Sequence, residues 1–210
     1  MKNLQKYLMI LGTIMLSIGI SACSKQPDFD AKSYVQSSLD AYYHGEYKDY
    51  ANLLEISEKD AKKEIEEDFN ESIQKQFDDS DNITDKGIAD YAEKLTEVKK
   101  LAKYKVQDEK KDEDGNYTVS VKVEPSDVFQ TLQQSSAEVS KEKIAQGMKE
   151  TDPGVFASVL TESVQKSIDK KSYGEPVSVT VKVEKNHSGT YELSETERSK
   201  LETAMFPTTE

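Results

Sequence analysis

The chain has 210 residues, a formal net charge of −12 at pH 7 and 32% charged side chains. An acidic protein repels phosphate groups, so this composition argues against a protein that binds nucleic acid. Cys23 is the only cysteine in the sequence, which excludes an internal disulfide.

The N-terminus has the layout of a secretory signal peptide. Lys2 and Lys6 supply positive charge, residues 7–20 form a largely apolar stretch of 14 residues, and two small residues follow. The stretch is too short to cross a bilayer, which needs about 20 apolar residues. We therefore expect residues 1–22 to be a signal peptide that is removed during export.

The four residues Ile20-Ser21-Ala22-Cys23 resemble the lipobox of bacterial lipoproteins, in which a leucine and two small residues usually precede the cysteine. Isoleucine replaces the leucine here, a change that the pattern tolerates. The resemblance implies cleavage between Ala22 and Cys23 and attachment of a diacylglyceryl group, with palmitate-like chains, to the Cys23 sulfur. Two acyl chains anchor a protein stably, because each buried methylene contributes about 0.8 kcal/mol. The alternative is an ordinary signal peptide, or an uncleaved anchor, with an incidental cysteine.

Cleavage at this point would leave 188 residues with a formal charge of −14, because Lys2 and Lys6 are lost. We expect residues 23–28 to form a lipidated cysteine with a short polar tether. Residues 29–206 would form a single extracytoplasmic domain, long enough for a hydrophobic core, and residues 207–210 a tail. The expected location is the outer face of the cell membrane.

The first half of this domain carries apolar residues at helical spacing. The expected helices cover residues 34–43, 47–54, 58–77 and 88–102. His44-Gly45 ends the first of them, and Ser57 with Asp60 has the spacing of a helix-capping pair. An acidic loop, residues 78–85, separates the last two helices.

After these helices, apolar and polar residues alternate at every second position. This pattern is typical of strands with one buried face and one solvent-exposed face. We expect a hairpin of residues 104–109 and 117–123 around Asp114-Gly115, and another of residues 177–183 and 190–193 around Ser188-Gly189.

Further helices are expected near residues 127–148 and 153–171, between the two hairpins. Asp152 would cap the second of these, with Pro153 at its first position. A last helix would begin at Ser194, with Glu197 completing a capping box. The element order predicts an α+β fold, with N-terminal helices followed by two antiparallel β-hairpins that form one sheet with helices packed on one face.

Segments 31–53, 103–130 and 172–206 together resemble a group of small Gram-positive (Firmicute) cell-surface lipoproteins of unknown function. The likeness covers roughly residues 28–206 and rests on strands, turns and helix caps. It implies the same surface location and a single domain. The family brings no catalytic residues that could be assigned to this chain.

The motifs of common enzymes are missing from the sequence, including HExxH, GxSxG and the phosphate-binding glycine loops. His44 and His187 each lie beside a glycine-containing turn, where solvated histidines are common. Two S-x-x-K matches, at residues 163–166 and 167–170, lack their companion motifs. We therefore expect no catalytic residue and no cofactor.

Two groups of side chains are candidate binding sites. Asp78, Asp79, Asp81 and Asp85 could gather a Ca²⁺ ion, although a solvated acidic loop explains them as well. Tyr43, Tyr47 and Tyr50, with the neighbouring Tyr42, could form the wall of a glycan or peptide groove. We favour a helix corner whose tyrosines pack into the core, because the apolar stripe of the first helix already includes residues 42 and 43.

The sequence favours a non-catalytic binding or interaction module at the cell envelope, held to the membrane by its N-terminal cysteine. Its partner would be an envelope protein or a small ligand. One alternative is an envelope-processing enzyme or accessory factor that uses carboxylates. Another is that the signal-peptide tail, Met15–Ala22, is released as a secreted signalling peptide.

Overall fold

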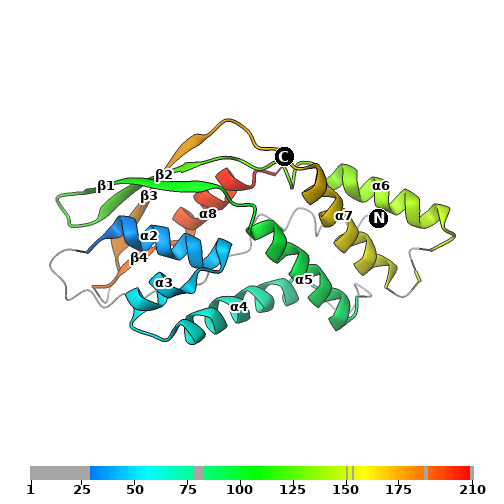
Figure 1. The fold of residues 1–210 in the computed structure, drawn as a ribbon, viewed down its shortest axis with the longest axis horizontal. Coiled ribbons are helices and arrows are strands. Elements are labelled where there is room, and N and C mark those ends of the chain that lie inside the picture. Colours follow the sequence, from blue (N-terminus) through cyan, green and yellow to red (C-terminus); the bar gives the residue numbers. More distant parts are fainter. Residues whose placement is uncertain (1–28, 78–82, 150, 153, 187–188, 209–210) are drawn as a thin grey trace.

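The structure is a computed structural model that describes residues 29–77, 83–149, 151–152, 154–186 and 189–208. The N-terminal half is helical, and the strands come after it (Figure 1). Its elements are α2 (Ala31–Leu39), the π-helical segment η2 (Asp40–His44), α3 (Tyr47–Leu54), α4 (Glu58–Gln74), α5 (Asp85–Lys99), β1 (Tyr104–Lys111), β2 (Tyr117–Val123), α6 (Leu132–Ala145), α7 (Val155–Lys170), β3 (Val177–Lys185), β4 (Tyr191–Leu193) and α8 (Glu195–Met205). The predicted α+β fold class is confirmed.

The four strands form one antiparallel sheet in the order β1-β2-β3-β4. Val121 at the centre of β2 pairs with Val106 on one side and with Val179 on the other. The odd-numbered residues of β2 are buried, whereas Lys122 between them is exposed. This alternation gives the sheet one apolar face, as the period of two predicts.

Helices α2 and α8 cover that face (Figure 1). The hydroxyl of Tyr34 in α2 accepts a hydrogen bond from the Leu193 N–H at 3.3 Å. The carboxylate of Glu197 in α8 accepts one from the Lys182 N–H at 3.0 Å. At the edge of this layer the Phe29 ring stacks on Tyr191, with 4.2 Å between centroids. The packing of helices on one face is thus provided mainly by these two, because α6 and α7 extend sideways from the sheet.

Side-chain caps begin several helices. The Ser57 hydroxyl accepts a hydrogen bond from the Asp60 N–H at 3.1 Å, and Ser194 accepts one from the Glu197 N–H at 3.4 Å. Both predicted caps are confirmed in this respect. A full capping box at Ser194 would also need the Glu197 side chain to accept a hydrogen bond from the Ser194 N–H. Instead, the Glu197 side chain accepts one from the Lys182 N–H of strand β3.

The helices between the hairpins are shorter than the periodicity predicts. Asp127 lies before α6, and its side chain accepts a hydrogen bond from the Ser172 N–H at 2.6 Å, which ties this segment to the chain after α7. The prediction that Asp152 caps α7 is wrong. Its carboxylate accepts from the Lys149 N–H at 2.8 Å, and Gly154, with φ of 77°, precedes the helix. Pro153 lies outside the described residues.

Helix α7 packs against both α6 and α5, and together α6 and α7 form an arm beside the main body (Figure 1). The interface of α6 and α7 contains buried small polar residues, and the Ser167 hydroxyl donates to Ser135 at 3.0 Å. The contact of α5 with α7 depends on Gly87, where an added Cβ would lie 2.7 Å from the Ala157 Cβ. This glycine therefore permits the close approach of the two helices.

Gly87→Ala is expected to lower the free energy of unfolding by about 1–3 kcal/mol, measured by urea denaturation, because the new methyl group overpacks the helix interface. In an open helix the same change would stabilise the protein by up to about 1 kcal/mol. The double variant Gly87→Ala with Ala157→Gly should recover part of the loss. A single variant more stable than the wild type would contradict the close contact.

Candidate functional site

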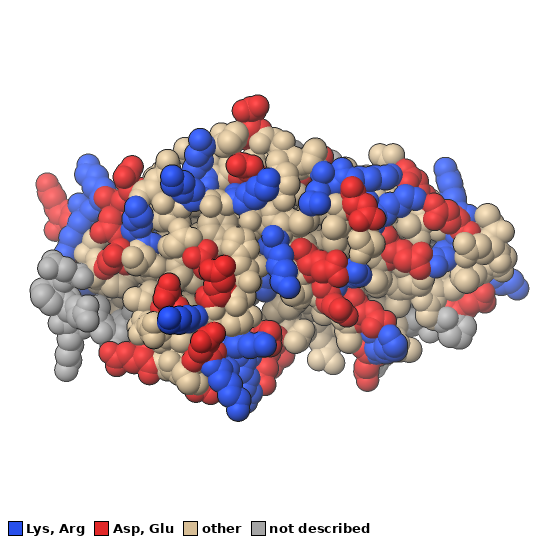
Figure 2. All heavy atoms as spheres, in the orientation of Figure 1, with Lys and Arg blue, Asp and Glu red and all other residues tan. Residues whose placement is uncertain are grey.

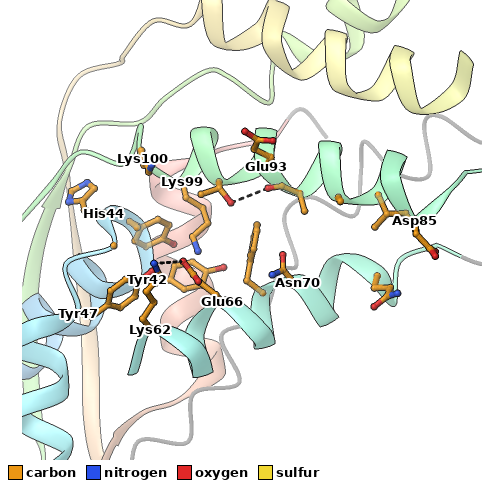
Figure 3. A pocket seen from close by; sticks show the side chains of 18 residues that line it. Tyr42, His44, Tyr47, Lys62, Glu66, Asn70, Asp85, Glu93, Lys99 and Lys100 are labelled. Atoms are coloured by element: carbon orange, nitrogen blue, oxygen red, sulfur yellow. Dashed lines mark hydrogen bonds and ion pairs between the residues drawn. The ribbon is translucent and has the colours of Figure 1, made fainter. Parts of the chain in front are cut away.

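A cleft with a volume of about 610 Å³ lies between α4 and α5 (Figure 3). The two helices run in opposite directions, so the start of α4 lies near the end of α5 (Figure 1). Segment η2 and the start of α3 close one end, which we call the inner end of the cleft. The lining residues of α4 are Lys62, Glu66, Phe69, Asn70 and Gln74, and those of α5 and its C-cap are Asp85, Ile88, Ala89, Ala92, Glu93, Thr96, Lys99 and Lys100.

On each helix the lining residues follow one another at intervals of one, three or four positions. They therefore form a single stripe along α4 and a single stripe along α5. The apolar stripe of α5, with Tyr91, Leu95 and Val98, is buried in the core. The more polar stripe beside it is therefore left facing the cleft. On α4 the buried residues Ile65 and Phe69 lie next to the polar lining residues in the same way.

Lys99 occupies the inner end, where its side chain extends from α5 toward Tyr42 (Figure 3). Its Nζ atom lies 3.7 Å from the centroid of the Tyr42 ring and 4.3 Å from that of Phe69. These are cation–π contacts with the faces of two aromatic rings. Among the described residues, no carboxylate forms an ion pair with Lys99 and no acceptor takes a hydrogen bond from it.

Behind this ammonium group, Lys99 and Glu202 of α8 line a second, small cavity of 20 Å³. Burial raises the pKa of the Glu202 carboxyl to about 8, although the nearby Lys99 opposes the shift. Burial likewise lowers the pKa of the Lys99 ammonium to about 8, opposed by Glu202 and Glu66. Each of the two groups therefore favours the charged form of the other, and burial opposes both.

His44 lies beside the inner end but is held by other groups. Its Nε2 atom is 3.0 Å from the Ala102 carbonyl oxygen, and its ring stacks on Tyr104 with 5.1 Å between centroids. The Tyr104 hydroxyl donates to Asp40 at 2.7 Å. His44 is thus held against Tyr104 and the Ala102 carbonyl while its side chain keeps 32% exposure, so it is only partly solvated. His187 lies outside the described residues.

The fold is shared with a known crystal structure. That protein is a "putative lipoprotein" (ycdA) from Bacillus subtilis, with a TM-score of 0.58 and 14% sequence identity. The match covers 83% of this chain and 55% of the other, so this chain spans about half the length of the Bacillus protein. At this identity the likeness concerns the fold alone. No family model matches the chain, and no curated protein does.

The structure separates the tyrosines that the sequence groups together. Tyr43 is buried at 4% exposure in the inner wall of the cleft, and Tyr50 is buried at 1% exposure in the core. Tyr47 is half-buried on the rim of the cleft, beside Gly45. Burial and then the nearby Glu66 carboxylate raise the pKa of the Tyr47 hydroxyl. The preferred interpretation as a packed helix corner thus fits Tyr42, Tyr43 and Tyr50, while Tyr47 lies where a ligand could touch it.

The other predicted site residues lie at or beyond the limits of the described chain. Ala22 and Cys23 are outside it, as are Asp78, Asp79 and Asp81, whereas Asp85 is exposed at the far end of the cleft. Calcium binding by this loop stays a prediction. Within the described residues, no three acidic, histidine or cysteine side chains are grouped to hold a metal ion. In the same part of the chain, every helix falls short of the length and apolarity that a membrane span needs.

Sequence reasoning missed Lys99, Phe69 and Glu66 as site residues. The helical periodicity places Phe69 in an apolar stripe, and Lys99 is one of 28 basic residues, so neither stands out in the sequence. One signal was present, because Lys99 directly follows the buried Val98 at the end of an amphipathic helix. A lysine in that position often lays its chain along the core.

Proposed function

We propose that this protein is a lipid-anchored lipoprotein on the extracytoplasmic face of a cell membrane, and that its domain is a non-catalytic binding module. The lipobox-like segment before Cys23 supports the anchor. The fold shared with a protein described as a lipoprotein agrees with this assignment. The surface is mixed in charge on the face shown in Figure 2, which offers no basic tract there for nucleic acid.

The observation that carries the binding role is the cleft between α4 and α5. Its volume of 610 Å³ falls in the range of small-molecule sites, which is about 300–1,000 Å³. Aromatic rings and a few charged groups line it, the combination that gives a ligand both contact area and orientation. Glu202 lines the small second cavity with Lys99 and is not among the residues that line the cleft.

Cys23→Ser tests the anchor. The full-length protein, expressed in a Gram-positive host and fed an alkyne analogue of palmitate, should be labelled and sediment with membranes, because two acyl chains hold it there. The variant should carry no label. Ser24→Ala is the matched control and should behave as the wild type. An unlabelled wild-type protein, or a labelled Cys23→Ser variant, would contradict lipidation at this residue.

Ala89→Trp tests the cleft, since Ala89 is an exposed lining residue of α5 and a large ring there would fill the space. Purified full-length protein in detergent is screened against a library of small metabolites and peptides by thermal shift. Ligands of the cleft should stabilise the wild type and the control Ala137→Trp, on the exposed side of α6, but not Ala89→Trp. A screen in which every stabilising compound also stabilises Ala89→Trp would refute the cleft as the binding site.

A further inference from the structure

Strand β3 is paired over most of its length on one side only. It registers with β2 from Val177 to Val183, whereas the short strand β4 pairs only with Val183–Lys185. Figure 1 shows the first part of β3 at the upper edge of the molecule, away from β4. The side of Val177–Lys182 that faces away from β2 is therefore an edge of the sheet, which we call the β3 edge.

One hydrogen bond shows which backbone groups lie on the β3 edge. The Lys182 N–H donates to the Glu197 carboxylate of α8 at 3.0 Å, so it points away from β2. In an antiparallel strand, the N–H and C=O groups of every second residue point to the same side. The backbone groups of Ser178 and Thr180 therefore point outward as well, toward the open side of β3.

These outward groups are left unpaired. In the described part of the chain, the backbone N–H groups of Ser178 and Thr180 have no hydrogen-bond partner. Both residues are exposed, and the neighbouring Val177 keeps 43% exposure. Residues 177–181 also contain no proline and no charged side chain, two features that commonly block the edge of a sheet. The β3 edge is thus open to pairing with another strand.

The side chains beside the edge define the chemistry of a matching strand. On the solvent-exposed face of the sheet, Lys122 registers with Ser178, and Lys182 lies at the end of the edge. Neither ammonium group forms an ion pair with another described residue. On the apolar face, Val177 is exposed and Val179 is half-buried, so both can bury further surface. A strand with acidic side chains on one face and apolar side chains on the other would complement both faces.

We propose that the β3 edge binds an extended segment of a partner protein, in which acidic residues alternate with apolar ones. The segment adds to the sheet as an antiparallel strand beside Val177–Val181, with main-chain hydrogen bonds to Ser178 and Thr180. Glu184 lies on the same face of the sheet but beside β4, where it registers with Glu192, so it is outside the segment that the partner covers. This site is separate from the cleft between α4 and α5 and does not depend on what the cleft binds.

Hydrogen exchange of the full-length protein in detergent, followed for single amides by NMR, tests the strand addition. The probe is the acetylated and amidated peptide Val-Glu-Val-Glu-Val-Glu-Val, and the matched peptide has lysine in place of glutamate. We expect the probe to bind at millimolar concentration or below and to slow exchange of the Ser178 and Thr180 N–H groups about tenfold or more. The Val179 N–H points to β2 and should exchange slowly with and without the probe. The lysine peptide should bind about tenfold more weakly, because Lys122 and Lys182 repel it.

Two pairs of variants separate the hydrogen bonds from the charge. Thr180→Pro removes one outward N–H, which a free edge tolerates, and should abolish binding, whereas Thr180→Ala keeps this N–H and should bind as the wild type does. Lys122→Glu combined with Lys182→Glu should reverse the preference, so that the lysine peptide binds more tightly. Lys59→Glu combined with Lys63→Glu, on exposed positions of α4, makes the same change in net charge and should leave the preference unaltered.

A probe that does not bind, or that binds without slowing exchange at Ser178 and Thr180, would overturn the inference. Binding that Thr180→Pro retains would also overturn it, because strand pairing needs that N–H. Protection of the two amides without the probe, together with a dimer in light scattering that Thr180→Pro prevents, would reject the partner protein in favour of a second copy of this chain. The Ala89→Trp screen concerns the cleft alone, so its failure would leave the β3 edge standing.

Discussion

Tyr50→Ala is expected to lower the free energy of unfolding by about 3–5 kcal/mol, the usual range for removing a large buried aromatic side chain. Tyr50 is 1% exposed and belongs to α3, which packs against α2 and α4. Its ring therefore joins several helices of the N-terminal half, and alanine would leave a cavity among them. Urea denaturation followed by circular dichroism measures the loss.

Tyr47→Ala is the matched control for this result. It lies three residues earlier on the same helix but is half-buried at the cleft rim, so we expect a loss below about 1 kcal/mol. Tyr50→Phe keeps the ring and removes a buried hydroxyl that has no hydrogen-bond partner within the described structure, so it should be no less stable than the wild type. An equal loss of unfolding free energy for Tyr47→Ala and Tyr50→Ala would contradict the packing described here, in which only Tyr50 is fully buried.

Glu202→Gln is expected to raise the free energy of unfolding at pH 7 by about 1–3 kcal/mol. The folded protein holds the Glu202 proton up to a pKa of about 8, whereas an ordinary glutamate releases it near 4.5. The unfolded state therefore gains stability from ionisation as the pH rises from 4.5 to 8, and the folded state does not. One pKa unit corresponds to about 1.4 kcal/mol of unfolding free energy. The remaining solvent exposure of Glu202 lowers the gain that this conversion gives.

The sign of this effect is checked by its pH dependence. Below about pH 4.5 the wild type and Glu202→Gln should unfold with the same free energy, and the advantage of the variant should grow until about pH 8. Glu195→Gln, an exposed site in the first turn of the same helix, should give no such gain. A Glu202→Gln variant that is less stable at pH 7 would mean that Glu202 is ionised there and compensates Lys99.

Much of the fold follows from local patterns in the sequence. The predicted strand at residues 117–123 coincides with β2, and the short helix at residues 47–54 coincides with α3. A glycine with positive φ precedes each of them, Gly115 before β2 and Gly45 before α3, and such turns act over a few residues. The sheet could be inferred because two alternating valine strands need each other to bury one face.

The cleft could not be inferred, because it depends on contacts between distant residues. Lys99 meets Phe69 and Tyr42, which lie 30 and 57 residues earlier in the chain. The apolar stripe at the N-terminus also predicts one continuous helix, whereas α2 passes into the π-helical segment η2. A π-turn inserts one residue and rotates the side chains after it, so the directions of Tyr42 and His44 were not predictable from a period of 3.6.

The stacking of Phe29 on Tyr191 holds the first described residue against the sheet, which limits how far this end could lie from the anchor that we propose. Five residues, 24–28, separate Phe29 from Cys23, the lipid attachment that we propose, and the six steps between them can reach at most about 20 Å. The Phe29 end of the long axis would then stay close to the bilayer, and the arm of α6 and α7 lies at the opposite end (Figure 1). An anchor at Cys23 would thus keep the Phe29 end of the domain within reach of the bilayer, and the arm of α6 and α7 is the part of the molecule farthest from that point.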